Sequence, residues 1–126
     1  MDITVNQEVI NDTAKLMIHR LVARALARDP SLIEGAKTSH KRARERFPDR
    51  TFVRRWNELL ASPLSELRLR LVSRDRDMDR LRLSSPFATA DGFDFTEPVL
   101  RRRIWAAARR LAVRAVNRRE LDRRPG

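Results

Sequence analysis

The chain has 126 residues, of which 36% are charged and 41% hydrophobic, and a net charge of +11, which together indicate one basic folded domain. These values argue against a disordered polyampholyte, and no apolar run approaches the roughly 20 residues of a membrane-spanning helix. The lack of cysteine excludes a disulfide framework, a thiol nucleophile and a cysteine-type zinc site. The N-terminus has no signal-peptide pattern, so we expect a cytoplasmic bacterial protein.

Two helices are predicted in the first third of the chain. From Val9 onward, apolar residues recur at helical spacing, while arginines recur every four residues on another face. Asp29 and Pro30 are expected to end this helix and start the next, because Asp caps well and Pro is tolerated at a first helical position. The expected buried residues of the first helix are Ile10, Ala14, Met17, Leu21 and Ala25, with Ile18 and Val22 beside them. Those of the second are Leu32 or Ile33, Ala36, His40, Ala43 and Phe47, before Pro48 ends it.

The segment RTFVRRWNELLAS, residues 50–62, predicts a short third helix. Its residues spaced for burial are Phe52, Val53, Trp56, Leu59 and Leu60. Ser62 and Pro63 repeat the combination of a cap and a helix-starting proline, and Leu64, Leu67 and Leu71 continue from them at helical spacing. A fourth helix is therefore expected here.

The stretch RDRDMDRLRLSSPF, residues 74–87, alternates in charge before a Ser-Ser-Pro stop. A strand would have no apolar face, whereas a helix places Met78 and Leu81 together on a buried face. Such a helix also predicts ion pairs three residues apart, namely Arg74–Asp77, Arg76–Asp79, Asp77–Arg80 and Asp79–Arg82. We expect a solvated helix, with Phe87 packed back against the core.

No catalytic residue, metal site or cofactor is predicted. The three aspartates of this stretch begin like a calcium-binding loop, but Arg80 and Pro86 stand where that loop needs Gly and Glu. The two histidines, His19 and His40, have no partner at metal-ligand or catalytic-triad spacing, so we expect packed or surface residues. There is no Gly-rich phosphate loop, and we do not expect an enzyme.

A long, basic last helix is predicted after the loop ATADGFDF, residues 88–95, with Thr96 as its cap. Its expected apolar face comprises Leu100, Ile104, Ala107, Ala108, Leu111 and Ala115. Residues 96–126 carry 10 basic and 3 acidic groups, whereas residues 63–95 carry 6 of each. The candidate residues for binding nucleic acid or a partner are Arg101, Arg102, Arg103, Arg109, Arg110, Arg114, Arg118 and Arg119.

A helix of this kind is typical of nucleic-acid binding, because Arg contacts to phosphates give salt-dependent affinity of low sequence specificity. Trp56 and Trp105 each follow arginines and are candidates for stacking on bases, although a Trp at helical spacing more often packs in a core. An anionic membrane is a weaker alternative, since the apolar side is rich in Ala, and Arg-rich codon usage is another explanation of the charge. No helix-turn-helix signature is found.

The fold prediction is an all-α, single-domain bundle of five to six helices, because no segment alternates apolar and polar residues over the length of a strand. Residues 1–95 are expected to form a helical body, and residues 96–126 the basic helix and a short tail of the same domain.

The run RRWNELLASPLSELRLRLVSRDRDMDRLRLSSPF resembles a segment of small helical bacterial proteins from toxin–antitoxin-like gene pairs. The shared pattern is W-x-x-L-L-x-x-P-x-x-x-L followed by L-R-x-S-S-P-F, and the resemblance covers roughly residues 20–88. It implies a non-enzymatic, antitoxin-like protein that docks on a cognate toxin-like protein and binds its own operator DNA. A stand-alone nucleic-acid-binding protein is the alternative, and a homodimer is compatible with either.

Overall fold

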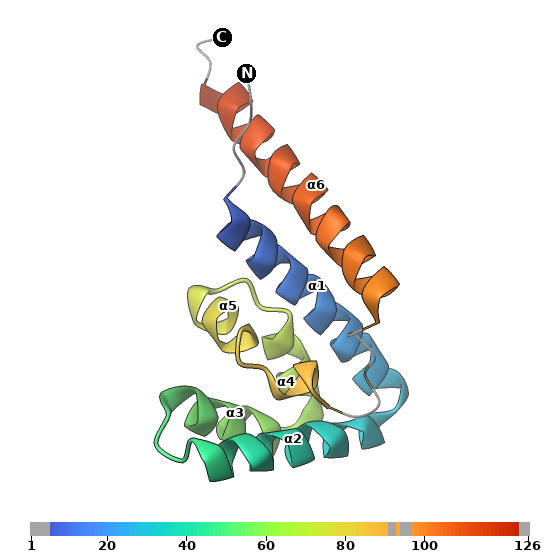
Figure 1. The fold of residues 1–126 in the computed structure, drawn as a ribbon, viewed down its shortest axis with the longest axis vertical. Coiled ribbons are helices and arrows are strands. Elements are labelled where there is room, and N and C mark those ends of the chain that lie inside the picture. The colour runs from blue at the N-terminus through green and yellow to red at the C-terminus, as the bar shows by residue number, and fades with distance from the viewer. Residues whose placement is uncertain (1–5, 91–92, 94–96, 124–126) are drawn as a thin grey trace.

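The computed structural model describes residues 6–90, 93 and 97–123, with side chains described as far as residue 118. Within these ranges the chain forms six α-helices, two short 3-10 turns and no strand, which confirms the predicted all-α bundle (Figure 1). The helices are α1 (Gln7–Arg28), α2 (Ile33–Arg46), α3 (Thr51–Ala61), α4 (Leu64–Leu71), α5 (Arg76–Arg82) and α6 (Pro98–Arg123). The 3-10 turns are η1 (Pro30–Leu32) and η2 (Pro86–Ala88).

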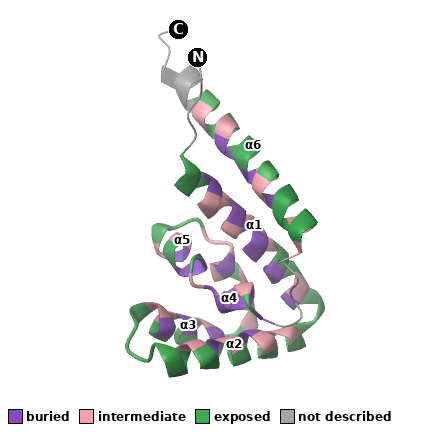
Figure 2. Cartoon of the chain, viewed as in Figure 1, coloured by how far each residue is buried: buried purple, intermediate pink, exposed green. Residues whose placement is uncertain are grey.

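Helix α1 is the central element of the bundle. It packs against α6 on one side and against α4 and α5 on the other (Figure 1). Helices α2 and α3 pack against each other at the end of the molecule farthest from the C-terminal turns of α6. Buried residues run along α1 and along the sides of α4 and α5, whereas the outer side of α6 is exposed (Figure 2). The basic helix therefore has one packed side and one open side.

Aromatic and aliphatic side chains fill the core beside α1. Trp56 is fully buried, and its indole nitrogen donates to the Leu81 carbonyl oxygen at 3.0 Å. The ring of Phe87 lies edge-on to Trp56 at 6.2 Å and to Phe93 at 5.6 Å, so the predicted return of Phe87 to the core is confirmed. Apolar side chains from α1, α4 and α5 complete the core, among them Ile18, Val22, Leu26, Leu67, Leu71 and Met78.

Side-chain caps fix where several helices begin. Asp29 caps η1 as predicted, because its carboxylate accepts the Ser31 backbone N–H at 3.1 Å. Asp75 caps α5 in the same way, through the Met78 backbone N–H at 2.8 Å. Ser62 does not cap α4; its hydroxyl instead donates to a carbonyl oxygen of α3, and it ends that helix. The predicted cap Thr96 lies outside the described residues.

Three of the four predicted ion pairs around α5 are replaced by other contacts. Only Asp79–Arg82 forms as expected. The chain turns before α5, so Asp75 acts as a cap, and Asp77 pairs with Arg55 of α3. A pattern of i,i+3 spacings cannot anticipate a partner from another helix, and this explains the wrong prediction.

Arg82 was expected on a solvated face but is only 1% exposed. Its guanidinium donates to the carbonyl oxygens of Leu71 at 3.1 Å and Ser73 at 2.7 Å, and it also pairs with Asp79. These contacts hold the turn that joins α4 to α5.

Phe47 was expected to be buried and is exposed, because it lies just beyond the last turn of α2.

Candidate nucleic-acid interface

Helix α6 packs against α1 through a narrow stripe of mostly small side chains. Ile104, Ala108 and Ala112 are buried in this contact. The prediction had continued the stripe through Leu111 and Ala115, but both are exposed, Leu111 by 44%. The contact follows a four-residue spacing, so Ala112 rather than Leu111 faces α1.

The described arginines of α6 are all exposed to solvent, with Arg101 at the junction with α1. They are Arg101, Arg102, Arg103, Arg109, Arg110, Arg114 and Arg118, and each is exposed. The side chain of Arg119, the remaining predicted residue, lies outside the described part of the chain. No Asp or Glu occurs in the sequence between Glu97 and Glu120. The helix therefore has no carboxylate of its own that would neutralise these arginines over five turns.

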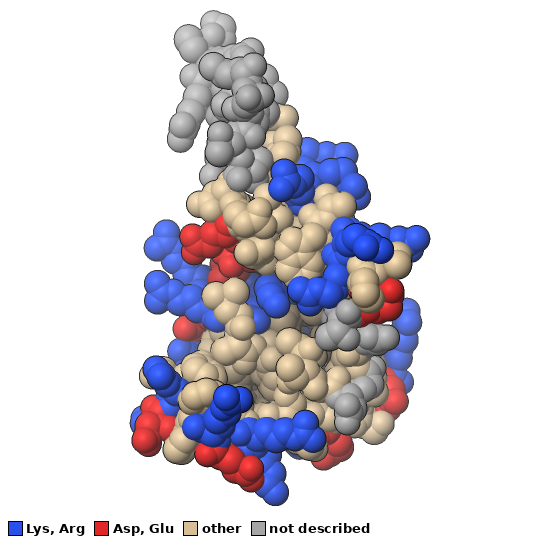
Figure 3. All heavy atoms as spheres, viewed as in Figure 1, with Lys and Arg blue, Asp and Glu red and all other residues tan. Residues whose placement is uncertain are grey.

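Two lines of arginine follow from the helical repeat. At 100° per residue, Arg103, Arg110 and Arg114 fall within about 40° of one another, and Arg102 and Arg109 form a second line beside them. With a rise of 1.5 Å per residue, the first line extends over about 17 Å. Lys and Arg side chains are gathered over α6, whereas the surface over α2 and α3 mixes basic and acidic side chains (Figure 3).

Glu97 holds the first turn of α6. Its carboxylate accepts the backbone N–H groups of Val99 at 2.9 Å and Leu100 at 2.8 Å. These two hydrogen bonds, and to a lesser degree the charge of Arg103, lower the pKa of Glu97 below its usual value. Glu97 is thus engaged at the helix start and supplies the cap that the sequence had assigned to its neighbour.

A cluster of two cations and one indole ring joins α1 to α6. The Trp105 indole nitrogen donates to the Asn11 side-chain oxygen at 3.0 Å. The Arg101 guanidinium carbon lies 4.8 Å from the ring centroid of Trp105, and the Lys15 amine lies 5.8 Å from it. Burial, and after it the charge of Arg101, lowers the pKa of Lys15. An anion at this point would relieve the repulsion between the two cations.

The position of Lys15 was not recognised from the sequence. Nothing in its spacing on α1 distinguishes it, since only the packing of α6 brings it beside Arg101. Trp56 is buried with its nitrogen engaged, so the expectation of a core residue is confirmed for it and the alternative of base stacking is wrong. Trp105 is half-buried, and the two cations lie over its ring.

Both histidines are packed within the body and lie apart from the arginines of α6. His19 is 1% exposed and forms hydrogen bonds with the Lys15 carbonyl oxygen and the Ser85 hydroxyl, each at 2.7 Å. Burial lowers the pKa of His19 to about 4, with the charge of Arg82 adding to this effect. His40 is also buried, at the packed side of α2.

Two negative findings apply to the ranges that the structure describes. No helix in them has both the length and the apolar character that crossing a membrane requires. No group of three or more His, Asp or Glu side chains there is arranged to hold a metal ion. Comparison with protein families, with curated proteins and with solved structures finds no match to this chain.

Proposed function

We propose that the protein is a non-enzymatic binding protein that contacts the phosphate backbone of nucleic acid through α6. The observation that carries the proposal is the set of seven exposed arginines on a helix with no acidic residue between Pro98 and Arg118. A helix held along one side by α1 presents these charges at fixed spacing, which reduces the ordering cost of binding.

The expected binding is electrostatic. Each arginine that contacts a phosphate releases counterions, so affinity falls with salt and depends little on base sequence. The cation pair Lys15 and Arg101 adds a second element, because binding a phosphate there offsets a repulsion already present in the free protein. Duplex DNA, including an operator upstream of the protein's own gene, fits this chemistry.

The test measures the affinity of the full chain for a labelled mixed-sequence DNA duplex as a function of salt. The variant R103Q/R110Q/R114Q removes one line of arginine and should reduce the salt slope by up to about 2.7, or 0.9 per lost phosphate contact. Its matched control is R42Q/R46Q/R54Q on α2 and α3, which changes the net charge equally at exposed positions away from α6. Equal loss in both variants, or no binding by the wild type at low salt, would contradict the proposal.

A second candidate function is antitoxin-like docking on a cognate toxin-like protein, and it rests on a groove between α1, α5 and α6. This groove has a volume of about 670 Å³, and the exposed apolar side chains Val9 and Leu111 line it. Two exposed arginines, Arg74 and Arg76, border it. Asp12 and Asp79 also line the groove, so the fitting occupant is an apolar segment of the partner that carries a carboxylate for the arginines and a basic group for these aspartates.

This candidate is tested by co-expression with the product of the adjacent gene. Copurification at high salt and relief of that product's toxicity are expected, with both lost in the variant Leu111→Asp. Leu83→Asp is the control, because Leu83 is also exposed and lies outside the groove. If neither variant affects copurification, or a second copy of this chain takes the groove instead, the docking proposal fails.

A further inference from the structure

Helices α2 and α3 enclose a second basic site at the opposite end of the molecule from the C-terminal turns of α6. Between them lies a cavity of about 410 Å³. Its polar lining includes Lys37, His40, Lys41, Arg44 and Asn57, and its apolar wall includes Leu60. None of the lining residues is acidic. The cavity is open to solvent, because most of its lining residues are exposed, and its volume is large enough for a small molecule.

His40 contributes a buried polar atom without a hydrogen bond. The residue is 5% exposed, and its Nε2 has no partner among the described residues. Burial, followed by the charge of Arg44, lowers the pKa of His40, and a hydrogen bond with the Asn57 side chain opposes these effects. A buried nitrogen of this kind costs free energy in the unbound protein and favours a ligand that hydrogen-bonds to it.

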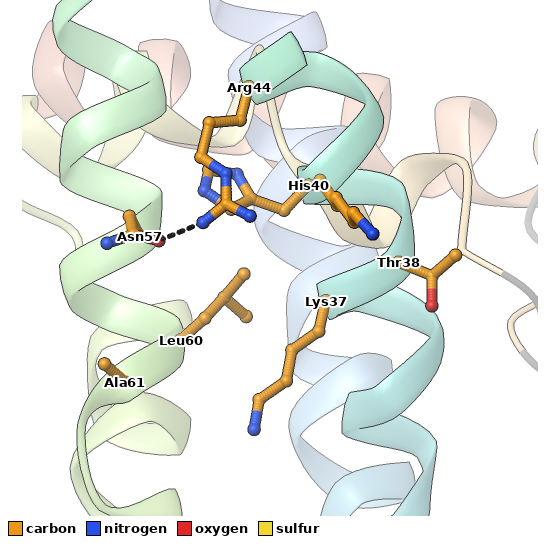
Figure 4. Close-up of a pocket in the computed structure, with 8 residues that line it drawn as sticks. Lys37, Thr38, His40, Arg44, Asn57, Leu60 and Ala61 are labelled. Atoms are coloured by element: carbon orange, nitrogen blue, oxygen red, sulfur yellow. Dashed lines mark hydrogen bonds between the residues drawn. The ribbon is translucent and has the colours of Figure 1, made fainter. Parts of the chain in front are cut away.

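The cations of the site have few competing partners. Figure 4 shows the Arg44 guanidinium and the Lys37 amine extending into the space between α2 and α3, with the imidazole of His40 beside the guanidinium. Arg44 makes one long hydrogen bond, from Nη1 to the Asn57 side-chain oxygen at 3.4 Å. Lys37 has one exposed partner, Glu34 at 3.8 Å. Both contacts are weak, so an arriving anion displaces little.

We propose that this cavity binds the phosphate group of a small phosphorylated molecule. Arg44 offers the forked pair of donors that matches a phosphate, Lys37 and Lys41 add charge, and the His40 imidazole lies beside the guanidinium, where its resonances report on binding. Leu60 lies where the non-phosphate part of the ligand would rest. The cavity is larger than a phosphate ion, which favours a phosphate monoester with an apolar or planar substituent.

The experiment uses the purified full chain and follows the imidazole resonances of the two histidines by NMR. Titration with inorganic phosphate, and separately with a nucleoside 5′-monophosphate, should shift the His40 signals saturably and leave those of His19 unchanged. The parent nucleoside without phosphate should produce no shift. The monophosphate should bind with a Kd of about 1 mM or lower, tighter than inorganic phosphate.

The variants identify the site. Arg44→Gln should weaken monophosphate binding by about tenfold, because it removes a charged, two-donor contact. Arg54→Gln is the matched control, as Arg54 is exposed on α3 and does not line the cavity. If Arg44→Gln is poorly folded, Lys41→Gln, at an exposed position, should give a smaller loss of the same kind.

Three results would overturn the proposal. The first is no shift of His40 with either phosphate compound, and the second is equal weakening by Arg44→Gln and Arg54→Gln. The third is a loss of duplex DNA affinity in Arg44→Gln as large as that of the α6 variant, since the cavity would then take backbone phosphates. The α6 proposal is unaffected by the first two outcomes, so the two proposals fail separately.

Discussion

Helices α5 and α6 are both rich in arginine, and the protein uses these arginines in opposite ways. Around α5, aspartates alternate with the arginines, and carboxylates also receive Arg55 from α3 and Arg70 from α4. Between Pro98 and Arg118 of α6 no aspartate or glutamate intervenes, and the guanidinium groups are exposed. Arginine content alone therefore does not identify a binding surface. Whether carboxylates lie among the arginines decides it.

The arginines of the two helices also differ in burial. Arg82 is enclosed, and its two Nη atoms contact two carbonyl oxygens and a carboxylate, so it works as a structural link between α4 and α5, although its buried Nε has no partner among the described residues. The exposed pairs near it, such as Arg70–Asp75 at 3.4 Å, contribute little stability by themselves. Their effect on function is larger, because they neutralise this part of the surface.

The largest expected effect comes from Arg82. Arg82→Met should lower the free energy of unfolding by about 3–5 kcal/mol, because two buried carbonyl oxygens and Asp79 lose their donor. Urea denaturation measures this change. The control Arg80→Met, at an exposed position of the same helix, should change the value by less than about 0.5 kcal/mol. If the two variants lose similar amounts of unfolding free energy, the structural role assigned to the buried Arg82 is wrong.

The next effect is the pH dependence set by His19. Its pKa is lowered to about 4 in the folded protein, so the unfolded chain binds more protons between about pH 6.5 and 4. Stability is therefore present above pH 6.5 and is lost as the pH falls toward 4, by about 3 kcal/mol in total.

Unfolding measured at several pH values separates this loss from carboxylate titration, because the variant His19→Gln should lose about 3 kcal/mol less than the wild type over the same range. The nearby charge of Arg82 contributes to the lowered pKa, so this measurement also reports on the buried arginine. A wild type and variant with parallel pH curves would contradict the assignment.

A single carboxylate introduced into α6 should make it resemble α5. Ala106 is exposed and lies three or four positions from Arg102, Arg103, Arg109 and Arg110. Ala106→Glu should therefore weaken DNA binding by about tenfold while changing the free energy of unfolding by less than about 0.5 kcal/mol.

The control for this substitution is Ala27→Glu, at an exposed position near the end of α1. It adds the same charge away from α6 and should change DNA affinity only slightly. Anisotropy titrations at fixed salt compare the two variants. If they weaken binding equally, net charge rather than the α6 surface governs the affinity.

The smallest effect is expected at the junction of α1 and α6. Trp105→Phe removes the hydrogen bond to Asn11 but keeps an aromatic ring for the two cations. Because Gln7 also donates to the Asn11 oxygen at 3.2 Å, no acceptor is left unpaired, and the cost should be about 0.5 kcal/mol. Thermal unfolding measures this loss, and a loss above about 2 kcal/mol would show that the indole is a core residue.

Helical spacing predicted which segments form helices and that Met78 is buried, but it also predicted burial for Leu21 and Phe47, which are exposed. It could not predict the pairing of Asp77 with Arg55, because that contact depends on how α3 crosses α5. The burial of Arg82 could not be predicted from the sequence for the same reason. A periodic pattern identifies a face, whereas the partner of that face is decided by tertiary packing.

The candidate sites divide in the same way. The arginines of α6 follow from local sequence, since the stretch between Pro98 and Arg118 has no acidic residue to pair with them wherever the helix packs. Lys15 and the cavity around His40 depend on pairs of helices distant in the sequence or joined by a turn. The residues of both sites come together only through the packing of α1 beside α6 and of α2 beside α3.

The alanine-rich contact between α1 and α6 has a consequence for the dynamics of the free protein. Ala108 and Ala112 bury little apolar area, so α6 is held to the body less firmly than the helices around Trp56 and Phe87 are held to one another. Its backbone amides should exchange with deuterated solvent before those of α4 and α5, as a separate cooperative unit. DNA that spans α6 would then slow this exchange selectively.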